Sequence, residues 1–139
     1  MATFFVSSTN SDFVILEEND SKHAIKVLRL KNGDLVDIID GFGTLISGII
    51  VDAHPKKAKV KILEKEKNKN PIMLGLAFCP TKNNDRNDWI IEKATEIGVT
   101  DFHPIYSQNS ERRKLNVNRM KKITISAIKQ SGNLWLPNI

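Results

Sequence analysis

The spacing of hydrophobic residues changes character about halfway along the chain. Before residue 65, apolar residues come in short runs separated by polar residues, a pattern typical of β-strands. The expected strands are Thr3–Val6, Phe13–Leu16, Leu35–Ile39, Thr44–Val51 and Lys56–Leu63. Within the last run, Ala58, Val60 and Ile62 alternate with lysines, which predicts one buried and one solvated face. The first part of the chain is therefore predicted to form a small, mostly antiparallel β-barrel.

A turn and a helix interrupt these strands. The dipeptide Asp40-Gly41 predicts a tight hairpin turn, because these residues accept the positive φ angles that such turns require. The segment before it has helical spacing, with Asp20 or Ser21 as the expected cap and Lys31–Gly33 as its end. Its buried face is expected to contain Ala24, Val27 and Leu28.

The second half of the chain has an α/β pattern. Glu64–Asn70 has no apolar residue and is expected to be a solvated linker. After it come strand Ile72–Cys79, a helix from Asp85 or Asn87 to Ile97, strand Val99–Tyr106 and helix Asn116–Ser131. The unbroken apolar character of the first strand predicts cover on both faces, and the element order predicts parallel strands. We expect domains over 1–69 and 70–139, the second being the front part of a longer domain.

The helices of this half are expected to bury one stripe each. In the first helix the stripe contains Ile90, Ala94 and Ile97, with Gly98 ending the helix. In the second helix it contains Met120, Ile123, Ala127 and Ile128, with Gly132 after the last turn. Cys79 lies inside an apolar strand and is expected to be a buried hydrophobic residue.

Composition excludes several classes of protein. With 40% hydrophobic and 27% charged residues, the 139-residue chain can form a folded core and is not expected to be disordered. A single cysteine forms neither a disulfide framework nor a thiolate zinc site. The apolar run Pro71–Pro80 is shorter than the roughly 18–20 residues that cross a bilayer, and the N-terminus does not resemble a signal peptide. A cytoplasmic protein without a membrane partner is the expectation.

Positive charge is concentrated in the second half of the chain. The formal net charge is +5, and Glu111–Lys129 contains seven basic residues and one acidic residue. Such a segment can contact phosphates, because each neutralised phosphate releases condensed counterions. An ordinary solvated helix face explains the same pattern equally well.

Common catalytic motifs are absent from the sequence. It has no glycine-rich dinucleotide loop after Cys79, no P-loop, no His-Glu-x-x-His and no Gly-x-Ser-x-Gly. His23, His54 and His103 lack partners at metal-ligand spacing, so no metal site is expected. The missing glycine-rich loop also argues against an α/β nucleotide-binding fragment.

Two segments carry polar residues at helical spacing. In HAIKVLRL, residues His23, Lys26 and Arg29 share one side of the predicted helix. Before and within NDWIIEKATEIGV, residues Arg86, Lys93 and Glu96 share a flank beside a tryptophan. Solvated faces and surface ion pairs remain open as explanations of both segments.

At these residues the sequence resembles the bacterial 16S ribosomal RNA (uracil-N3) methyltransferases, which belong to the SPOUT class and carry an N-terminal PUA-like domain. The resemblance covers the whole chain in order. Its pieces are HAIKVLRL with Asn32-Gly33-Asp34, the Asp40-Gly41 turn, Lys82 ahead of NDWIIEKATEIGV, His103-Pro104-Ile105, SQNSERRK over Ser107–Lys114, Ala127–Ser131 and Leu136-Pro137.

The resemblance implies an α+β protein, with a PUA-like RNA-binding β-barrel followed by the first part of a SPOUT, trefoil-knot α/β domain with a parallel sheet. It implies methylation of N3 of a uridine in the decoding region of 16S ribosomal RNA. The residues expected to shape the active site are Arg86, Lys93, Glu96 and Gln130, although Glu96 could simply orient Lys93. Those expected to bind RNA are His23, Lys26, Arg29, Lys82, Arg112, Arg113 and Lys114.

The methyl donor of this family is S-adenosylmethionine, held in a C-terminal knot by a Gly-Pro-Glu-Gly-Gly-like loop. No such loop occurs in these 139 residues, so no donor site and no methylation by this chain alone are expected. Asn133 also stands where many members have an arginine. The expected partners are 16S ribosomal RNA or the small ribosomal subunit, and a second copy of the chain in a homodimer. The alternative function is an RNA-binding module whose second domain is structural.

Overall fold

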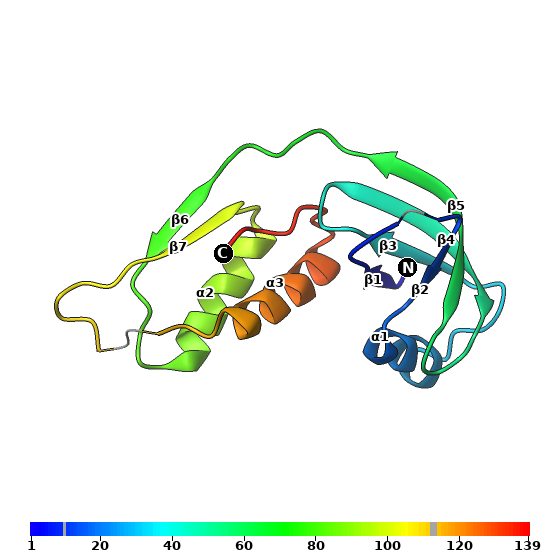
Figure 1. The fold of residues 1–139 in the computed structure, drawn as a ribbon, viewed down its shortest axis with the longest axis horizontal. Helices are drawn as coiled ribbons and strands as arrows, with labels where there is room; N and C mark the ends of the chain where they lie inside the picture. The colour runs from blue at the N-terminus through cyan, green and yellow to red at the C-terminus, as the bar shows by residue number, and fades with distance from the viewer. Residues whose placement is uncertain (10, 112–113) are drawn as a thin grey trace. The chain divides into compact units, whose positions relative to one another are not determined.

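The computed structural model describes residues 1–9, 11–111 and 114–139. The chain divides into two compact units, Met1–Lys69 and Asn70–Ile139. The first unit is built around a five-stranded sheet, and the second combines a parallel strand pair with two helices (Figure 1). The predicted α+β class, with a mostly antiparallel β-unit before an α/β unit, is confirmed.

The sheet of the first unit curls around its own core (Figure 1). Its strands are β1 (Thr3–Phe5), β2 (Phe13–Ile15), β3 (Leu35–Ile39), β4 (Thr44–Asp52) and β5 (Lys59–Lys67). They lie in the order β1-β3-β4-β5-β2, with β1 parallel to β3 and every other pair antiparallel. Between β3 and β4 the Asp40 carboxylate accepts hydrogen bonds from the amides of Phe42 and Thr44, as expected of a turn at this place.

The core of this unit comes from the alternating positions of the strands. Val36, Ile38 and Ile46 are fully buried, and Ala58 and Val60 of the lysine-rich run lie beside them. The lysines between those two residues and after them point away from the core, so the predicted alternation is confirmed.

The predicted linker is partly a strand. Residues 64–67 belong to β5 and pair with residues 44–47 of β4, although every side chain in 64–67 is exposed. Backbone hydrogen bonds to β4 suffice for this pairing without apolar side chains on residues 64–67, so composition could not reveal the extension. Only residues 68–70 remain as an irregular connection.

A bulge interrupts the pairing of β4 with β5 at Ser47 and Gly48. The backbone of β5 comes so close to Gly48 that a Cβ there would collide with the Val60 side chain and contact the Lys61 carbonyl oxygen. Glycine at position 48 therefore leaves the space that the Val60 side chain occupies between the two strands.

The helical segment differs from the prediction. It starts earlier, as α1 (Glu18–Lys22), and continues as the π-helical turn η1 (His23–Val27). The wider π turn changes which side chains face the sheet. Val27 and Leu28 are 64% and 42% exposed, so placing them in the core was wrong. Ile25 and Leu30 pack against the core in their place.

A buried hydroxyl joins the helical segment to two strand ends. Ser21, fully buried, donates from Oγ to the Leu16 carbonyl oxygen at 3.0 Å and accepts from the Ala58 amide at 2.9 Å. A buried amide that loses its acceptor retains its full desolvation cost. Ser21 therefore stabilises the helix against the sheet.

Replacing Ser21 by Ala should lower the free energy of unfolding of the first unit by about 1–3 kcal/mol, because the Ala58 amide would be left without an acceptor. Urea unfolding followed by circular dichroism measures the change. Ser7→Ala, at an exposed position, is the matched control and should change stability by less than about 0.5 kcal/mol. Equal effects of the two substitutions would contradict a structural role for the buried hydroxyl.

The second unit pairs two parallel strands and two helices. Strand β6 (Gly75–Phe78) lies beside β7 (Asp101–Pro104), as the element order predicted. Helices α2 (Asn84–Glu96) and α3 (Val117–Ser131) pack against each other. Gly132 ends α3 with a φ of 75°. On the other edge of β7, Asn138 exchanges backbone hydrogen bonds with Thr100 and Phe102.

Strand β6 is less covered than predicted. Ile72 and Met73, ahead of the strand, are 90% and 73% exposed, and the strand buries mainly Phe78. The expectation of cover on both faces was therefore wrong for this structure, in which the helices supply one layer. Cys79 is exposed, so its predicted burial was also wrong.

The helices bury most of the predicted stripe. Ala94, Met120, Ala127 and Ile128 are buried as expected. Ile97 was predicted to be buried but is 77% exposed, because it lies at the end of α2 where the chain turns away. Ile91, fully buried, takes the core position instead. No helix in the described part of the chain has an apolar stretch long enough to cross a bilayer.

Candidate functional site

The start of α2 is fixed by an asparagine that the sequence pattern did not single out. Asn83 is the N-cap, and its Oδ1 accepts from the amides of Asp85 at 2.8 Å and Arg86 at 3.4 Å. The predicted caps, Asp85 and Asn87, were wrong because both lie inside the first turn. Asparagine is a preferred N-cap residue, so the two asparagines before Asp85 were the available signal.

The loop before α2 is held by a buried amide. Asn87, only 3% exposed, accepts from the Thr81 amide at 2.8 Å and donates from Nδ2 to the Thr81 carbonyl oxygen at 2.8 Å. The Thr81 hydroxyl donates to the same Asn87 oxygen at 3.1 Å. This reciprocal pairing, which we call the Thr81–Asn87 clasp, fixes the path of the chain between β6 and α2.

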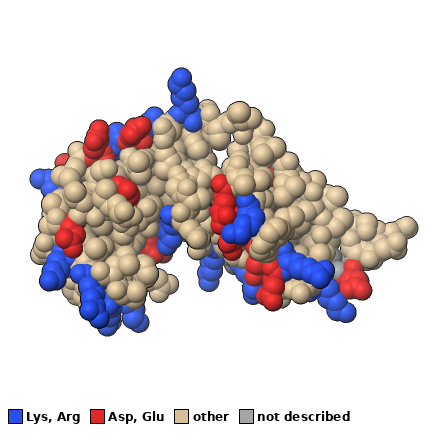
Figure 2. Space-filling view, turned by 180° about the vertical axis from the view of Figure 1, so that it is seen from behind, with Lys and Arg blue, Asp and Glu red and all other residues tan. Residues whose placement is uncertain are grey.

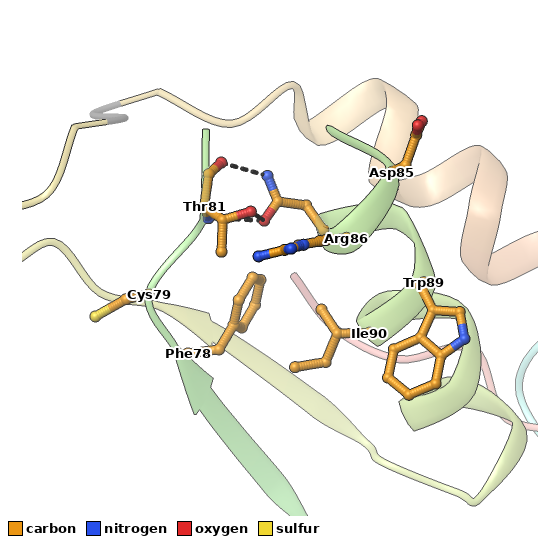
Figure 3. Close-up of a pocket in the computed structure, with 8 residues that line it drawn as sticks. Phe78, Cys79, Thr81, Asp85, Arg86, Trp89 and Ile90 are labelled. Atoms are coloured by element: carbon orange, nitrogen blue, oxygen red, sulfur yellow. Dashed lines mark hydrogen bonds between the residues drawn. The ribbon is translucent and has the colours of Figure 1, made fainter. Parts of the chain in front are cut away.

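A cavity of about 550 Å³ lies where β6 ends and α2 begins (Figure 3). Aromatic and aliphatic side chains form much of its wall, with a few polar groups at one side. The lining residues are Phe78, Cys79, Thr81, Asp85, Arg86, Asn87, Trp89 and Ile90. An apolar cavity with a small number of polar groups is the usual character of a ligand site.

Arg86 and Trp89 give the cavity its chemical character. In Figure 3 the Arg86 side chain extends across the cavity between Thr81 and Phe78, while the Asp85 carboxylate points away. Among the described residues no carboxylate forms an ion pair with Arg86. The Trp89 indole is 63% exposed beside Ile90. The cavity therefore combines a cation with a large aromatic surface.

Lys93 and Glu96, two further candidates on α2, do not line the cavity. They form an ion pair of 3.0 Å, and Lys93 also contacts Glu92 at 2.8 Å. The hydrogen bonds that the Lys93 ammonium donates to Glu92 and Glu96 raise the pKa of Lys93, and the same ammonium group lowers the pKa of Glu92. The sequence alone left open that Glu96 simply orients Lys93. The ion pair between the two side chains is the contact that such a role needs.

A second ion pair ties α3 to α2. The Arg119 guanidinium binds the Asp88 carboxylate with two donor nitrogens, Nε lying 3.1 Å from both oxygens. Hydrogen bonding to Asp88 raises the pKa of Arg119. Arg119 belongs to the basic segment Glu111–Lys129, so one of the cations that suggested a phosphate surface serves helix packing instead.

The barrel candidates for RNA contact are all exposed. His23 and Lys26 lie on η1, and Arg29 follows it with a φ of 56°. A non-glycine residue with this backbone conformation is uncommon, and π-helical turns frequently occur at functional sites. These three exposed residues thus lie within one short segment of the first unit.

The remaining candidates are dispersed in the second unit. Lys82 is 84% exposed and lies 3.9 Å from Glu111. Lys114 and Gln130 are exposed. Arg112 and Arg113, both predicted to contact RNA, lie outside the described residues. Lysines and arginines alternate with acidic side chains on the face shown in Figure 2, so charge alone marks no single continuous basic patch on that face.

No group of three or more metal-binding side chains gathers in the part of the chain that the structure describes. Sequence reasoning missed Phe78, Thr81 and Ile90 as lining residues and Asn87 as a clasp. The signal that could have found them is position, since ligands of α/β sheets bind beyond the carboxyl ends of parallel strands.

Comparison with protein families assigns both units. A model described as an RNA methyltransferase domain matches residues 68–139, and one described as an RNA methyltransferase PUA domain matches residues 16–63. The fold therefore belongs to the class of PUA-containing RNA methyltransferases. Because the first match covers more than half of the residues, the chain belongs to the RNA methyltransferase family.

Individual relatives agree with this assignment. Ribosomal RNA small subunit methyltransferase E of Mesomycoplasma hyopneumoniae is 30% identical over all of this chain and 61% of its own length. The enzyme of the same name from Buchnera aphidicola is 28% identical over 93% of this chain and 54% of its own. The chain thus spans little more than half the length of these curated relatives.

Solved structures show the same fold. A probable rRNA-methyltransferase from Porphyromonas gingivalis aligns over the whole chain and 59% of its own length, with 33% identity and a TM-score of 0.90. A ribosomal RNA small subunit methyltransferase E from Neisseria gonorrhoeae, crystallised bound to S-adenosyl methionine, gives 27% identity and a TM-score of 0.87 over 100% of this chain and 60% of its own.

Replacing Asn87 by Ala should lower the free energy of unfolding of the second unit by about 1–3 kcal/mol, because the Thr81 amide and carbonyl lose their partner. Thermal unfolding measures the change. Asn84→Ala, an exposed position on the same helix, is the matched control. Hydrogen exchange at Thr81 should also become faster in the Asn87 variant, and unchanged exchange would contradict the clasp.

Proposed function

We propose that this chain supplies RNA binding and part of the active-site scaffold for the S-adenosylmethionine-dependent methylation of N3 of a uridine in 16S ribosomal RNA. Three findings support the proposal: the PUA and methyltransferase models match in sequence order, the curated relatives act by name on small-subunit ribosomal RNA, and the relative from Neisseria gonorrhoeae binds S-adenosyl methionine. A cytoplasmic homodimer is part of the same proposal.

Residues 1–69 are assigned to RNA binding and residues 70–139 to the scaffold. In the first unit, His23, Lys26 and Arg29 would bind phosphates and position the RNA, which is the usual role of backbone contacts. In the second unit, Lys82 and Lys114 would add phosphate contacts, and the predicted role of Arg112 and Arg113 stays a prediction. Lys93, Glu96 and Gln130 are assigned to the active-site scaffold, although none of them lines the cavity at α2.

The chemistry of the reaction requires a base-sized site. N3 of uracil lies on the Watson–Crick edge and carries a proton, so the base must be unpaired and must lose that proton before or during methyl transfer. The loss leaves negative charge on the uracil ring, which a nearby cation stabilises. The observation that carries the proposal is the Arg86 guanidinium extending across an apolar cavity beside the Trp89 indole.

Each wall of the cavity has a role in this assignment. Phe78, Trp89 and Ile90 would contact the apolar faces of the base, and Arg86 would hydrogen-bond its carbonyl oxygens. The Thr81–Asn87 clasp would hold the wall in place before the base arrives, so that little ordering is required on binding.

We assign this cavity to the base and not to the methyl donor. S-adenosylmethionine carries a sulfonium cation beside its carboxylate and ammonium groups, and the Arg86 guanidinium across the cavity offers that cation no negative partner. The Asp85 carboxylate, which could offset that charge, points away. The 139 residues also lack the Gly-Pro-Glu-Gly-Gly-like loop of the resemblance. We therefore assign no residue of this chain to donor binding and derive no step through the donor.

A chimera tests the function. Residues 1–139 would replace the matching 60% of the Neisseria gonorrhoeae relative, and reverse transcription on unmodified 16S ribosomal RNA would report N3 methylation as a stop. The chimera should produce the stop, and Arg86→Gln should reduce its rate at least tenfold because the developing charge on uracil loses its cation. Arg86→Lys should restore part of the rate.

Binding of S-adenosylmethionine by the chimera, measured by calorimetry, shows that it has folded. A chimera that binds the donor but gives no stop would contradict the proposed activity and favour the RNA-binding module without catalysis.

The base assignment has its own test in the 139-residue chain. In a Trp135→Phe background, fluorescence reports Trp89 alone, and uridine should quench it because the base stacks near the indole. Ribose 5-phosphate, which has no base, is the control and should not quench. Arg86→Gln should weaken the response to uridine several-fold. Equal quenching by uridine and ribose 5-phosphate would contradict the assignment of the base to this cavity.

A further inference from the structure

The outer face of the first unit contains an apolar and cationic surface that the functional assignment above does not use. In the antiparallel pairing of β2 with β5, Phe13 lies opposite Lys61 and Ile15 lies opposite Lys59. Val14, between the two apolar residues, is buried with its partner Val60. Because side chains alternate along a strand, Phe13, Ile15, Lys59 and Lys61 share the outer side. We call these four residues the β2–β5 outer face.

This face is open and adjoins a cavity. Phe13 is 39% exposed and Ile15 is 62% exposed. A cavity of about 550 Å³ is lined by both residues, together with Ser8, Ser11, Val14 and Lys59, and the Ser11 hydroxyl accepts a hydrogen bond from the Phe13 amide at 3.1 Å. β2 is the last strand of the sheet order, so the surface lies at the sheet edge. Large apolar side chains, cations and hydroxyl groups thus meet in one accessible place.

Within this face, the side chain of Lys59 contacts the aromatic ring of Phe13. The Lys59 ammonium lies 4.4 Å from the centre of the Phe13 ring, within the range of a cation–π interaction. The lysine stem is long and flexible, so its ammonium can move from the ring to a nearby anion. The ring would then be free to contact a planar group.

We propose that the β2–β5 outer face binds an unpaired nucleotide of single-stranded RNA. The base stacks on Phe13 and packs against Ile15, the flanking phosphates bind Lys59 and Lys61, and the hydroxyls of Ser8 and Ser11 hydrogen-bond the ribose or the base edge. Aromatic side chains beside basic residues on a sheet are the general solution for single strands. This site is separate from the segment His23–Arg29, and it rests on the proposed RNA-binding role of the first unit.

Charge favours RNA over a protein partner. Lys59 and Lys61 lie two residues apart on β5 and point to the same side of the sheet. On β4, Asp52 is the register partner of Lys59, whereas the partner of Lys61 is the uncharged Ile49. Two cations spaced two residues apart on a strand can contact successive phosphates of an extended single strand, which releases counterions. A duplex would hide its bases from Phe13, so a single strand is the form that the face fits.

The test uses the 139-residue chain and a fluorescein-labelled octauridylate, with anisotropy measured over a range of salt concentrations. Phe13→Ala should weaken binding by about tenfold, as expected for the loss of one stacked base. Phe13→Leu, which keeps the apolar packing, should weaken it nearly as much, whereas Phe42→Ala at another exposed aromatic residue should not.

The lysines have a quantitative signature. The double variant Lys59→Gln, Lys61→Gln should reduce the slope of log Kd against log salt by about 1.4, because each phosphate contact on a single strand contributes about 0.7. Lys69→Gln, at an exposed position outside the strand, is the single-charge control. Circular dichroism on every variant verifies the fold.

Each outcome decides the inference. Unchanged affinity in both phenylalanine variants and an unchanged salt slope in the double variant would overturn it and favour a protein partner for this face. If Lys26→Gln, Arg29→Gln weakens binding while the face variants do not, the inference fails and the proposed function stands. If the unmodified chain binds neither octauridylate nor 16S ribosomal RNA, both fail.

Discussion

The buried pairing of Asn87 with Thr81 is the constraint on which the second unit depends. A strand that ends and a helix that begins within a few residues leave backbone groups without partners. Asn87 satisfies both the amide and the carbonyl of Thr81, while Asn83 satisfies the first amides of α2. These two asparagines fix the direction in which α2 leaves β6. The positions of Arg86 and Trp89 on the first turns of that helix follow from this direction.

The fold could be predicted from periodicity wherever one face of an element is buried and the other is solvated. The run through Val60 alternates cleanly, and its strand was confirmed. Periodicity failed where the side chains have no apolar pattern. The exposed residues 64–67 extend β5 through backbone pairing alone. It also failed at His23–Val27, because a π turn has a different period from the α-helix assumed in the prediction. The predicted ends of β5 and of the helical segment were therefore misplaced.

The candidate site was only partly accessible to sequence reasoning. Arg86 was identified from its spacing along a helix, but the same reasoning grouped it with Lys93 and Glu96, which pair with each other outside the cavity. Net charge could not separate Arg119, which packs two helices together, from cations available to a ligand. Pairing between side chains depends on tertiary contacts, such as the 31-residue separation of Arg119 and Asp88, and no local pattern contains them.

The close contact at Gly48 has a consequence for how the first unit can evolve. A methyl group at this position would occupy the space of the Val60 side chain, so a larger residue at 48 is tolerable only after residue 60 has become smaller. Val60 is itself fully buried, and shrinking it first would leave a void. The two positions are therefore expected to remain unchanged together or to drift only as a coupled pair among descendants of this gene.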